Sequence, residues 1–314
     1  MAQITVAIIN WNTHGETLDA LRSIRKQRFE DFEVLLIDNG SAPENKRALQ
    51  EGLKDVRKEA AFEIRYHDIK DNCGFSGAAN IGLREAKSPF VLLLNNDVII
   101  RDGLWLSELM EPMSDPRVAM TASKVIFYDG VNNDKIQFAG GRLCIFGVSH
   151  HDGFGEKDGP AFSKRKETFW AMGVSVLLRK SALDEMPEYI CPHYFTYGEE
   201  LDLCWRLRNN GYRIVFCPAS VIYHKGSMSI KANKAMGKSD WYTMRNKYLT
   251  FWRNLPTWQA ALVFPLVLGF DFARSLKRGG GFFSYYIGAI KAFAELYPKV
   301  RKYKNGSLRQ LALW

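Results

Sequence analysis

Residues 90–98 read FVLLLNNDV, an apolar run that ends in two amides and a carboxylate. An apolar run without polar alternation is typical of a strand that is buried on both faces of a parallel sheet. Four further runs of this kind lie at 4–9, 32–37, 62–67 and 117–122. Amphipathic stretches separate the runs near 15–28, 44–54, 77–86 and 104–112. This alternation predicts an α/β fold, with a mainly parallel sheet covered by helices on both faces.

The composition agrees with a folded protein of this class. The chain has 314 residues, of which 46% are hydrophobic and 25% charged, and this excludes disordered, collagen-like and coiled-coil proteins. The length allows one large α/β domain with an appendage, or two smaller domains. Five cysteines without metal-type pairs, and an amino terminus without a signal-like run, predict a reducing, cytoplasmic location.

The positive charge is concentrated at the carboxyl-terminal end. The formal net charge is +9, and residues 225–314 hold 16 Lys and Arg against three acidic residues. Such a block beside apolar runs predicts an anionic membrane surface as a partner, with a solvated basic face as the alternative. Nucleic acid would not explain the strand-end carboxylates described below, so we expect no nucleic-acid partner. We divide the chain into a nucleotide-binding domain over 1–238 and a basic, amphipathic helical region over 239–314.

The carboxyl-terminal region has a helical pattern over residues 240–303. We expect the helices to break at Pro256, at Pro265 and at Gly279–Gly281. The longest apolar run, residues 260–270, contains a proline and 11 residues, whereas a membrane-spanning helix needs about 20. The run therefore predicts an amphipathic element that lies on the membrane.

The run at 90–98 delivers Asn95, Asn96 and Asp97 to the carboxyl edge of the sheet, where ligands bind in folds of this kind. A carboxylate at this edge can bind a divalent metal that bridges a diphosphate, because Mg²⁺ and Mn²⁺ prefer oxygen ligands. A plain Asn/Asp turn after the strand is the alternative.

Two more polar stretches reach the same edge. LLIDNGS places Asp38 at the end of its strand, where the carboxylate can accept from the N3–H of uracil or thymine. In NCGFSGAANIGL, Gly74 permits close backbone approach, and Asn72 and Asn80 can hydrogen-bond a nucleotide. This is not the GxGxxG fingerprint after a first strand, so a hydride-transfer enzyme is disfavoured.

The densest group of charges is YGEELDLCWRLRNNGY, residues 197–212. On a helix that begins near Glu199, the residues Glu199, Asp202 and Arg206 share one stripe, which predicts a structural ion-pair network. Glu200 is rotated about 100° away and is free to face a cleft. An acid that only favours the helix dipole is the alternative interpretation.

Eight stretches carry a resemblance to a known family. In chain order they are VAIINWN, LLIDNGS, NCGFSGAANIGL, LNNDV, WAMGVSVLLRKSAL, YGEELDLCWRLRNNGY, VIYHKGSMS and YTMRNK. Together, over about residues 3–250, they resemble the family 2 inverting glycosyltransferases of GT-A fold. The nearest likeness is to the bacterial rhamnosyltransferase-like branch that builds cell-surface polysaccharides.

The resemblance implies roles at the matching positions. The nucleotide site would contain Asn10, Asp38, Asn72, Gly74, Asn80 and Asn95. Asp97 takes the metal-binding position of the family's DXD-type motif, and His224 matches a histidine that joins this metal, Mg²⁺ or Mn²⁺. Glu200 matches the general base, with Glu199 as the alternative. The sugar and acceptor pocket would be lined by Trp170, Gly173, Glu199 and Asp202.

The chain departs from the family pattern at two of these positions. NND keeps one carboxylate, which implies weak metal binding in the absence of nucleotide and His224. The position of the base commonly holds Asp, whereas here it holds Glu200.

The resemblance implies a metal-dependent, inverting transfer from a nucleoside diphosphate sugar to a saccharide or polyprenyl-linked acceptor. We expect dTDP-L-rhamnose as the donor, with UDP-galactofuranose or another UDP-hexose as the alternative. The enzyme would be cytoplasmic and peripheral on the inner face of the cell membrane. A sugar nucleotidyltransferase is disfavoured because NWNTHGET, after the first strand, has no cation-rich phosphate loop. A non-enzymatic membrane-surface binding protein would explain the basic tail alone.

Overall fold

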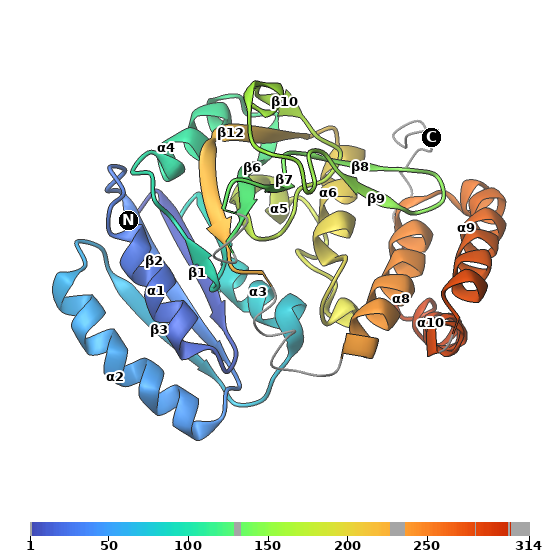
Figure 1. Cartoon of the computed structure of the whole chain (residues 1–314), viewed down its shortest axis with the longest axis horizontal. Helices are drawn as coiled ribbons and strands as arrows, with labels where there is room; N and C mark the ends of the chain where they lie inside the picture. Colours follow the sequence, from blue (N-terminus) through green and yellow to red (C-terminus); the bar gives the residue numbers. More distant parts are fainter. Residues whose placement is uncertain (1, 129–132, 227–235, 280, 301, 303–314) are drawn as a thin grey trace.

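The computed structural model describes residues 2–128, 133–226, 236–279, 281–300 and 302. A twisted sheet forms the centre, and three helices from the carboxyl-terminal end pack beside it (Figure 1). The chain first alternates strands and helices in the order β1 (Ile4–Asn10), α1 (His14–Ile24), β2 (Phe32–Asn39), α2 (Pro43–Glu59), β3 (Ile64–Ile69), α3 (Gly74–Glu85) and β4 (Phe90–Asn95). These four strands lie where the sequence predicts them.

The second half of the chain completes the sheet. Its elements are β5 (Val98–Ile99), α4 (Trp105–Met110), η1 (Glu111–Ser114), β6 (Val118–Phe127), β7 (Ile136–Phe138), β8 (Gly141–Leu143), β9 (Ser149–His151), η2 (Pro160–Phe162), β10 (Lys166–Glu167), β11 (Ser175–Arg179), α5 (Lys180–Asp184), η3 (Pro192–Tyr194), α6 (Glu199–Asn209) and β12 (Arg213–His224). The strand order is β10-β12-β6-β11-β4-β1-β2-β3, with β5 paired to β12 and β7 to β6.

The long strands run mainly in one direction. β1 is parallel to β2 and β4, β2 is parallel to β3, and β6 is parallel to β12. β11 is antiparallel to both β4 and β6, so β6 and β12 run in the direction of β1 to β4. The predicted α/β fold with a mainly parallel sheet is therefore confirmed.

Helices cover both faces of this sheet, because successive residues of a strand point to opposite sides. In β2, Leu35 and Ile37 cluster with Ala78 of α3. Val34 and Leu36, which alternate with them, belong to the core that contains Leu49 and Leu53 of α2. Burial on both sides explains why the strands read as continuous apolar runs.

The carboxyl-terminal region is helical, as the sequence predicts. It forms α8 (Met236–Asn254), α9 (Thr257–Arg278) and α10 (Gly281–Leu296). The chain leaves helical structure near Pro256 and Gly279, but Pro265 lies inside α9 and does not break it, so that expectation is wrong. Proline removes the hydrogen bond to the carbonyl four residues earlier. Both Ala261 and Pro265 are exposed, so the proline lies on the outward side of α9.

Because α9 continues through Pro265, the helix is longer than the apolar run from which a membrane span was excluded. The apolar run of 11 residues belongs to a helix of 22, and α9 is long and apolar enough to cross a membrane by length and composition. Only 33% of its most apolar window is buried. A single helix of this kind is weak evidence, because core helices of soluble proteins meet the same criterion.

Candidate active site

The ends of β1 and β2 meet, as predicted from parallel pairing. Asn10 and Asp38 lie opposite each other in the register, and Asn10 Nδ2 donates to Asp38 Oδ2 (2.7 Å). The backbone N–H of Ser41 donates to Asp38 Oδ1 (2.9 Å), and Lys46 Nζ lies 3.7 Å from the same oxygen. Asp38 is fully buried, so in this structure one of its oxygens fixes the turn that follows β2 and the other binds the end of β1.

A network that the sequence analysis missed joins this pair to the NND turn. Asn10 Oδ1 accepts from Thr17 Oγ1 (2.8 Å) of α1. Asn96 Nδ2 donates to the hydroxyls of Thr13 (2.6 Å) and Thr17 (2.8 Å). The two threonines, four residues apart at the start of α1, were the available sequence signal. Asn96 therefore fixes the turn that carries Asp97.

The loop before α3 is shaped by local bonds and by one distant contact. Asn72 Oδ1 accepts from the backbone N–H of Gly74 (2.8 Å) and from Asn39 Nδ2 (3.1 Å). Gly74 has φ +74°, and a Cβ there would lie 2.4 Å from the carbonyl oxygen of Phe195. The glycine thus permits approach of the chain segment before α6, which was not the predicted reason for it.

Asn80 is held by the segment at Ile190. Its Nδ2 donates to the carbonyl oxygen of Ile190 (2.7 Å), and its Oδ1 accepts from the backbone N–H of Ile190 (3.0 Å). Asn80 is buried and its amide is used on both sides. The structure therefore gives Asn80 a structural role in holding the segment at Ile190, in place of the predicted contact with nucleotide.

Asp97 and His224 are brought together, although 127 positions of sequence numbering separate them. His224 at the end of β12 pairs with Val98, the residue after Asp97. Its Nε2 lies 3.1 Å from Asp97 Oδ1, and the two residues are 6% and 8% exposed. Asn95 is half-buried beside them, and its side chain has no hydrogen-bond partner among the described residues.

These side chains suit a metal that takes other ligands from its substrate. Within the described part of the chain, no group of three or more His, Cys, Asp or Glu side chains is placed to hold a metal ion. One carboxylate and one imidazole can bind Mn²⁺ or Mg²⁺ when diphosphate oxygens and water fill the remaining positions. The donor set fits the predicted divalent metal and its predicted dependence on nucleotide.

The loop that leads into α6 has an uncommon backbone. Phe195, Tyr197 and Gly198 have φ of 63°, 66° and 86°. Positive φ in two non-glycine residues is unfavourable and persists only where surrounding contacts enforce it. Asn246 of α8 supplies such contacts, since its Nδ2 donates to the carbonyl oxygens of Tyr194 (3.1 Å), Thr196 (2.8 Å) and Tyr197. The motif YTMRNK, to which the sequence analysis assigned no role, contains this asparagine.

The loop positions two glutamates with different surroundings. Glu200 is half-buried, and its Oε2 accepts from the backbone N–H of Gly198 (3.1 Å). Gly173 is so close that a Cβ added to it would lie 3.6 Å from the Cβ of Glu200. Burial raises the pKa of Glu200 above its ordinary value. Glu199 is 6% exposed, and its Oε2 has no hydrogen-bond partner among the described residues. Burial and the charge of Glu200 raise the pKa of Glu199 well above its usual range.

The predicted ion-pair network forms without Glu199. Arg206 Nε donates to Asp202 Oδ2 (2.8 Å), as expected for a pair four residues apart. Glu199 and Arg206 are seven residues apart, about 10.5 Å along a helix, which is too far for contact. The expectation for Glu199 is therefore wrong.

Asp202 instead takes its other partners from α8. Its Oδ1 accepts from Arg253 Nε (3.0 Å) and Asn254 Nδ2 (2.8 Å). Burial raises the pKa of Asp202, but the charges of Arg253 and Arg206 outweigh this and lower it. At 1% exposure Asp202 lies in a buried network between α6 and α8, and not on the predicted pocket.

Trp170 and Gly173 lie on the segment that precedes β11. Trp170 is buried, its Nε1 donates to the carbonyl oxygen of Arg142 (3.2 Å), and its ring centroid is 4.8 Å from that of His151. These contacts place the indole of Trp170 in the buried aromatic core. Gly173 lies next to Glu200.

Known structures share this fold. It is similar to that of Staphylococcus aureus TarS 1–349, with a TM-score of 0.61 and 16% identity, covering 95% of this chain and 82% of that one. It is also similar to the mannosyltransferase PcManGT from Pyrobaculum calidifontis in complex with GDP-Man and Mn²⁺, with a TM-score of 0.57 and 13% identity, covering 98% and 77%. These likenesses concern the fold and agree with the expected GT-A type.

The sequence also matches curated proteins and a family model. It is 24% identical over 226 residues to the O-antigen biosynthesis protein RfbC of Myxococcus xanthus, a match that covers 70% of this chain and 17% of that protein. The chain spans between 13% and 37% of the length of the first curated relatives that it matches. The model of glycosyl transferase family 2 matches residues 5–187, more than half of the chain. These residues include the ends of β1, β2 and β4, and the chain therefore belongs to glycosyl transferase family 2.

Proposed function

We propose that the chain is a metal-dependent, inverting glycosyltransferase that moves a sugar from a nucleoside diphosphate sugar to an acceptor hydroxyl. The observation that carries this proposal is a direct link between the segment that holds Asp97 and the segment that packs against Glu200. The backbone N–H of Asn95 donates to the carbonyl oxygen of Val174 (2.9 Å), and the preceding Gly173 lies against the stem of Glu200. Asp97 follows Asn95 by two residues, so a candidate base and a candidate metal ligand flank one edge of the sheet.

In this reaction Glu200 accepts the proton of the acceptor hydroxyl while the hydroxyl oxygen attacks the anomeric carbon. The new bond forms on the face opposite the diphosphate, the bond from the anomeric carbon to the diphosphate oxygen breaks, and the configuration inverts. The metal, bound at Asp97 and His224, would stabilise the charge of the departing diphosphate. The raised pKa makes the Glu200 carboxylate a stronger base than an exposed glutamate.

The donor that we favour is dTDP-L-rhamnose, with UDP-galactofuranose or another UDP-hexose as the alternative. Asp38 is the proposed contact to the pyrimidine N3–H, which would replace one of its two present donors. Asn95, whose side chain has no hydrogen-bond partner in the part of the chain that the structure describes, is the proposed contact nearest the diphosphate. The similarity to an O-antigen biosynthesis protein supports a role in cell-surface polysaccharide synthesis, with a saccharide or polyprenyl-linked acceptor.

A panel of dTDP- and UDP-sugars with Mn²⁺ tests the activity and the donor. The true donor, at about 100 times its Kd, should stabilise the protein by about 2.7 kcal/mol in thermal unfolding. NMR of the product should show an inverted anomeric centre. Retention of configuration would reject the single displacement. Formation of a nucleotide sugar from a nucleoside triphosphate and a sugar phosphate would instead identify a nucleotidyltransferase.

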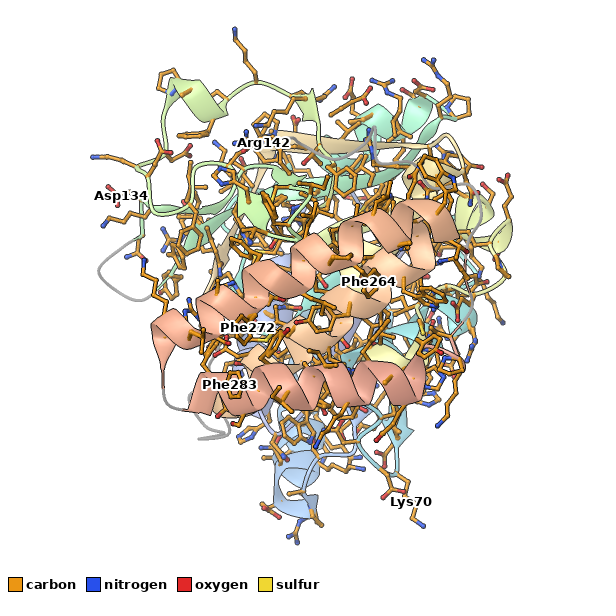
Figure 2. The ribbon with its side chains drawn as sticks, turned by 90° about the vertical axis from the view of Figure 1, so that its right-hand side faces the viewer. Lys70, Asp134, Arg142, Phe264, Phe272 and Phe283 are labelled. Carbon is orange, nitrogen blue, oxygen red and sulfur yellow. The ribbon has the colours of Figure 1, made fainter. Side chains whose placement is uncertain are left out.

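The outward side of α9 supports a membrane location. Six large apolar side chains are exposed on α9, namely Trp258, Leu262, Leu266, Phe270, Phe272 and Leu276. Its one carboxylate, Asp271, faces inward, where it pairs with Lys247 Nζ (2.7 Å) and accepts from the Tyr248 hydroxyl (2.8 Å). A water-facing helix has the opposite arrangement. α10 lies beside α9 over α8 and adds the exposed Phe283 (Figure 2).

We propose that this face of α9 and α10 docks the enzyme, as a peripheral protein, on the anionic inner surface of the cell membrane. Arg274, Lys277 and Arg278 are exposed at the end of α9, next to the apolar side chains. Apolar side chains bordered by cations are typical of interfacial helices. Docking there would hold the site near a polyprenyl-linked acceptor.

Replacing Leu262 and Leu266 together by glutamate should lower binding to phosphatidylserine-containing vesicles by at least tenfold. Burial of one leucine contributes about 1.5–3 kcal/mol, and each glutamate adds repulsion. Leu104→Glu, at an exposed leucine that precedes α4, is the matched control and should bind normally. Binding of the wild type should weaken at high salt. A folded wild-type protein that ignores such vesicles would refute the membrane proposal.

A further inference from the structure

His224 is held from two sides. Its Nε2 faces Asp97, and its Nδ1 lies 2.7 Å from Oε1 of Gln137. Gln137 is the middle residue of β7, which pairs with β6 next to the place where β12 ends in His224. Ile136 and Phe138 on either side of Gln137 are fully buried, so the direction of its side chain is set by the core.

The atom that faces Nδ1 decides where the imidazole proton lies. A carbonyl oxygen accepts hydrogen bonds and donates none, so Oε1 of Gln137 requires a proton on Nδ1. In a neutral imidazole the lone pair then lies on Nε2, which is 3.1 Å from Asp97 Oδ1, and a metal between these two atoms would take the place of a proton shared by them. A metal-binding histidine needs a free lone pair on one nitrogen, and it usually donates a hydrogen bond from the other.

We propose that Gln137 is a positioning residue that holds His224 in the tautomer and ring orientation in which Nε2 binds the divalent metal. The inference rests on the proposed function, since it concerns the same metal. The inference adds Gln137 of β7 to the residues that act on the metal. The pairing of β6 with β12 places His224 but supplies no partner for its Nδ1, and β7 supplies that partner. A glutamine that only satisfied a buried histidine nitrogen would leave metal affinity unchanged when replaced.

The test measures Mn²⁺ affinity by electron paramagnetic resonance in the presence of saturating UDP or dTDP. Gln137→Leu keeps much of the volume and removes the acceptor, and it should weaken Mn²⁺ binding by about 10- to 100-fold. Gln137→Glu keeps an acceptor oxygen and should retain wild-type affinity or exceed it. Gln3→Leu, at a half-buried glutamine before the opposite end of β1, is the matched control and should bind Mn²⁺ as the wild type does.

A second readout is independent of metal and of activity. In histidine-labelled wild-type protein, nitrogen NMR should show the His224 proton on Nδ1, and in Gln137→Leu this preference should be lost. Wild-type Mn²⁺ affinity in Gln137→Leu, or an Nδ1 without a proton in the wild type, would overturn the inference. If the wild type binds nucleotide but no Mn²⁺, the metal part of the proposed function fails as well, and this result is distinct from a defect confined to the variants. Should Gln137→Leu not fold, Gln137→Met takes its place in both measurements.

Discussion

Glu200→Gln is expected to lower the turnover number by at least about 100-fold while nucleotide-sugar binding and thermal stability stay near wild type. A general base contributes typically 10² to 10⁴ in rate, and an amide cannot take the proton of the acceptor. The loss should appear in kcat and not in KM, because the interaction develops only in the transition state. Steady-state kinetics and thermal unfolding check both parts.

The neighbouring glutamate is the matched control. Burial and the charge of Glu200 favour the neutral form of Glu199, which an amide resembles in charge and shape. Glu199→Gln should therefore fold normally and retain most of its turnover. If Glu199 belonged to the predicted ion-pair network, the same change would lower the stability of the protein. A folded but inactive Glu199→Gln beside an active Glu200→Gln would move the base by one residue.

The pH profile gives further support for the assignment. Burial raises the pKa of Glu200, so a larger share of the base is protonated just below neutral pH than for an exposed glutamate. The rate of transfer should rise with pH through this raised pKa. The rising limb should be absent from the residual activity of Glu200→Gln.

Asp97→Ala should remove most of the transfer activity and abolish nucleotide-dependent Mn²⁺ binding, with little loss of fold. Stabilisation of the leaving diphosphate by a metal is worth several kcal/mol, so we expect a loss of about 10² to 10³ in kcat. Calorimetric titration of Mn²⁺ with and without nucleotide checks the binding. Asp97→Asn keeps the shape of the side chain and removes its charge. If Asp97 is a metal ligand, this change should also weaken Mn²⁺ binding, whereas a residue that only fills space would tolerate it.

Two results would count against the metal assignment. The first is an Asp97→Ala enzyme with near wild-type activity. The second is tight Mn²⁺ binding without nucleotide, because one carboxylate and one imidazole leave most coordination positions to the diphosphate and water.

Much of the site was predictable because parallel strands bring their carboxyl ends to one edge. The residues at the ends of apolar runs, Asn10, Asp38 and Asp97, therefore had to lie near that edge, and the register pairs the first two. The resemblance to a family added His224, which lies 3.1 Å from Asp97. The prediction for Glu200 also agrees with its position beside Gly173, since a residue rotated 100° from the packed stripe of a helix faces elsewhere.

The direction of polar side chains was less predictable, because partners far away in the sequence decide it. Asn80 looked free to bind nucleotide, but the backbone of Ile190 uses its whole amide. Asp202 was predicted to line the pocket, but Arg253 and Asn254 of α8 donate hydrogen bonds to its carboxylate. Gln137 has no local signal at all, because its role depends on the end of β12.

The sequence by itself determined the sheet, its edge and the placement of catalytic candidates there, because burial on both faces imposes long apolar runs whose ends are visible. Only the tertiary structure decided which candidates face the site and which serve the packing. The packing of α8 supplies the partners of Asp202 and, through Asn246, the loop geometry before Glu200. The same packing turns Asp271 of α9 inward, toward Lys247. These contacts join segments whose local patterns are independent, so no stretch of sequence contains them.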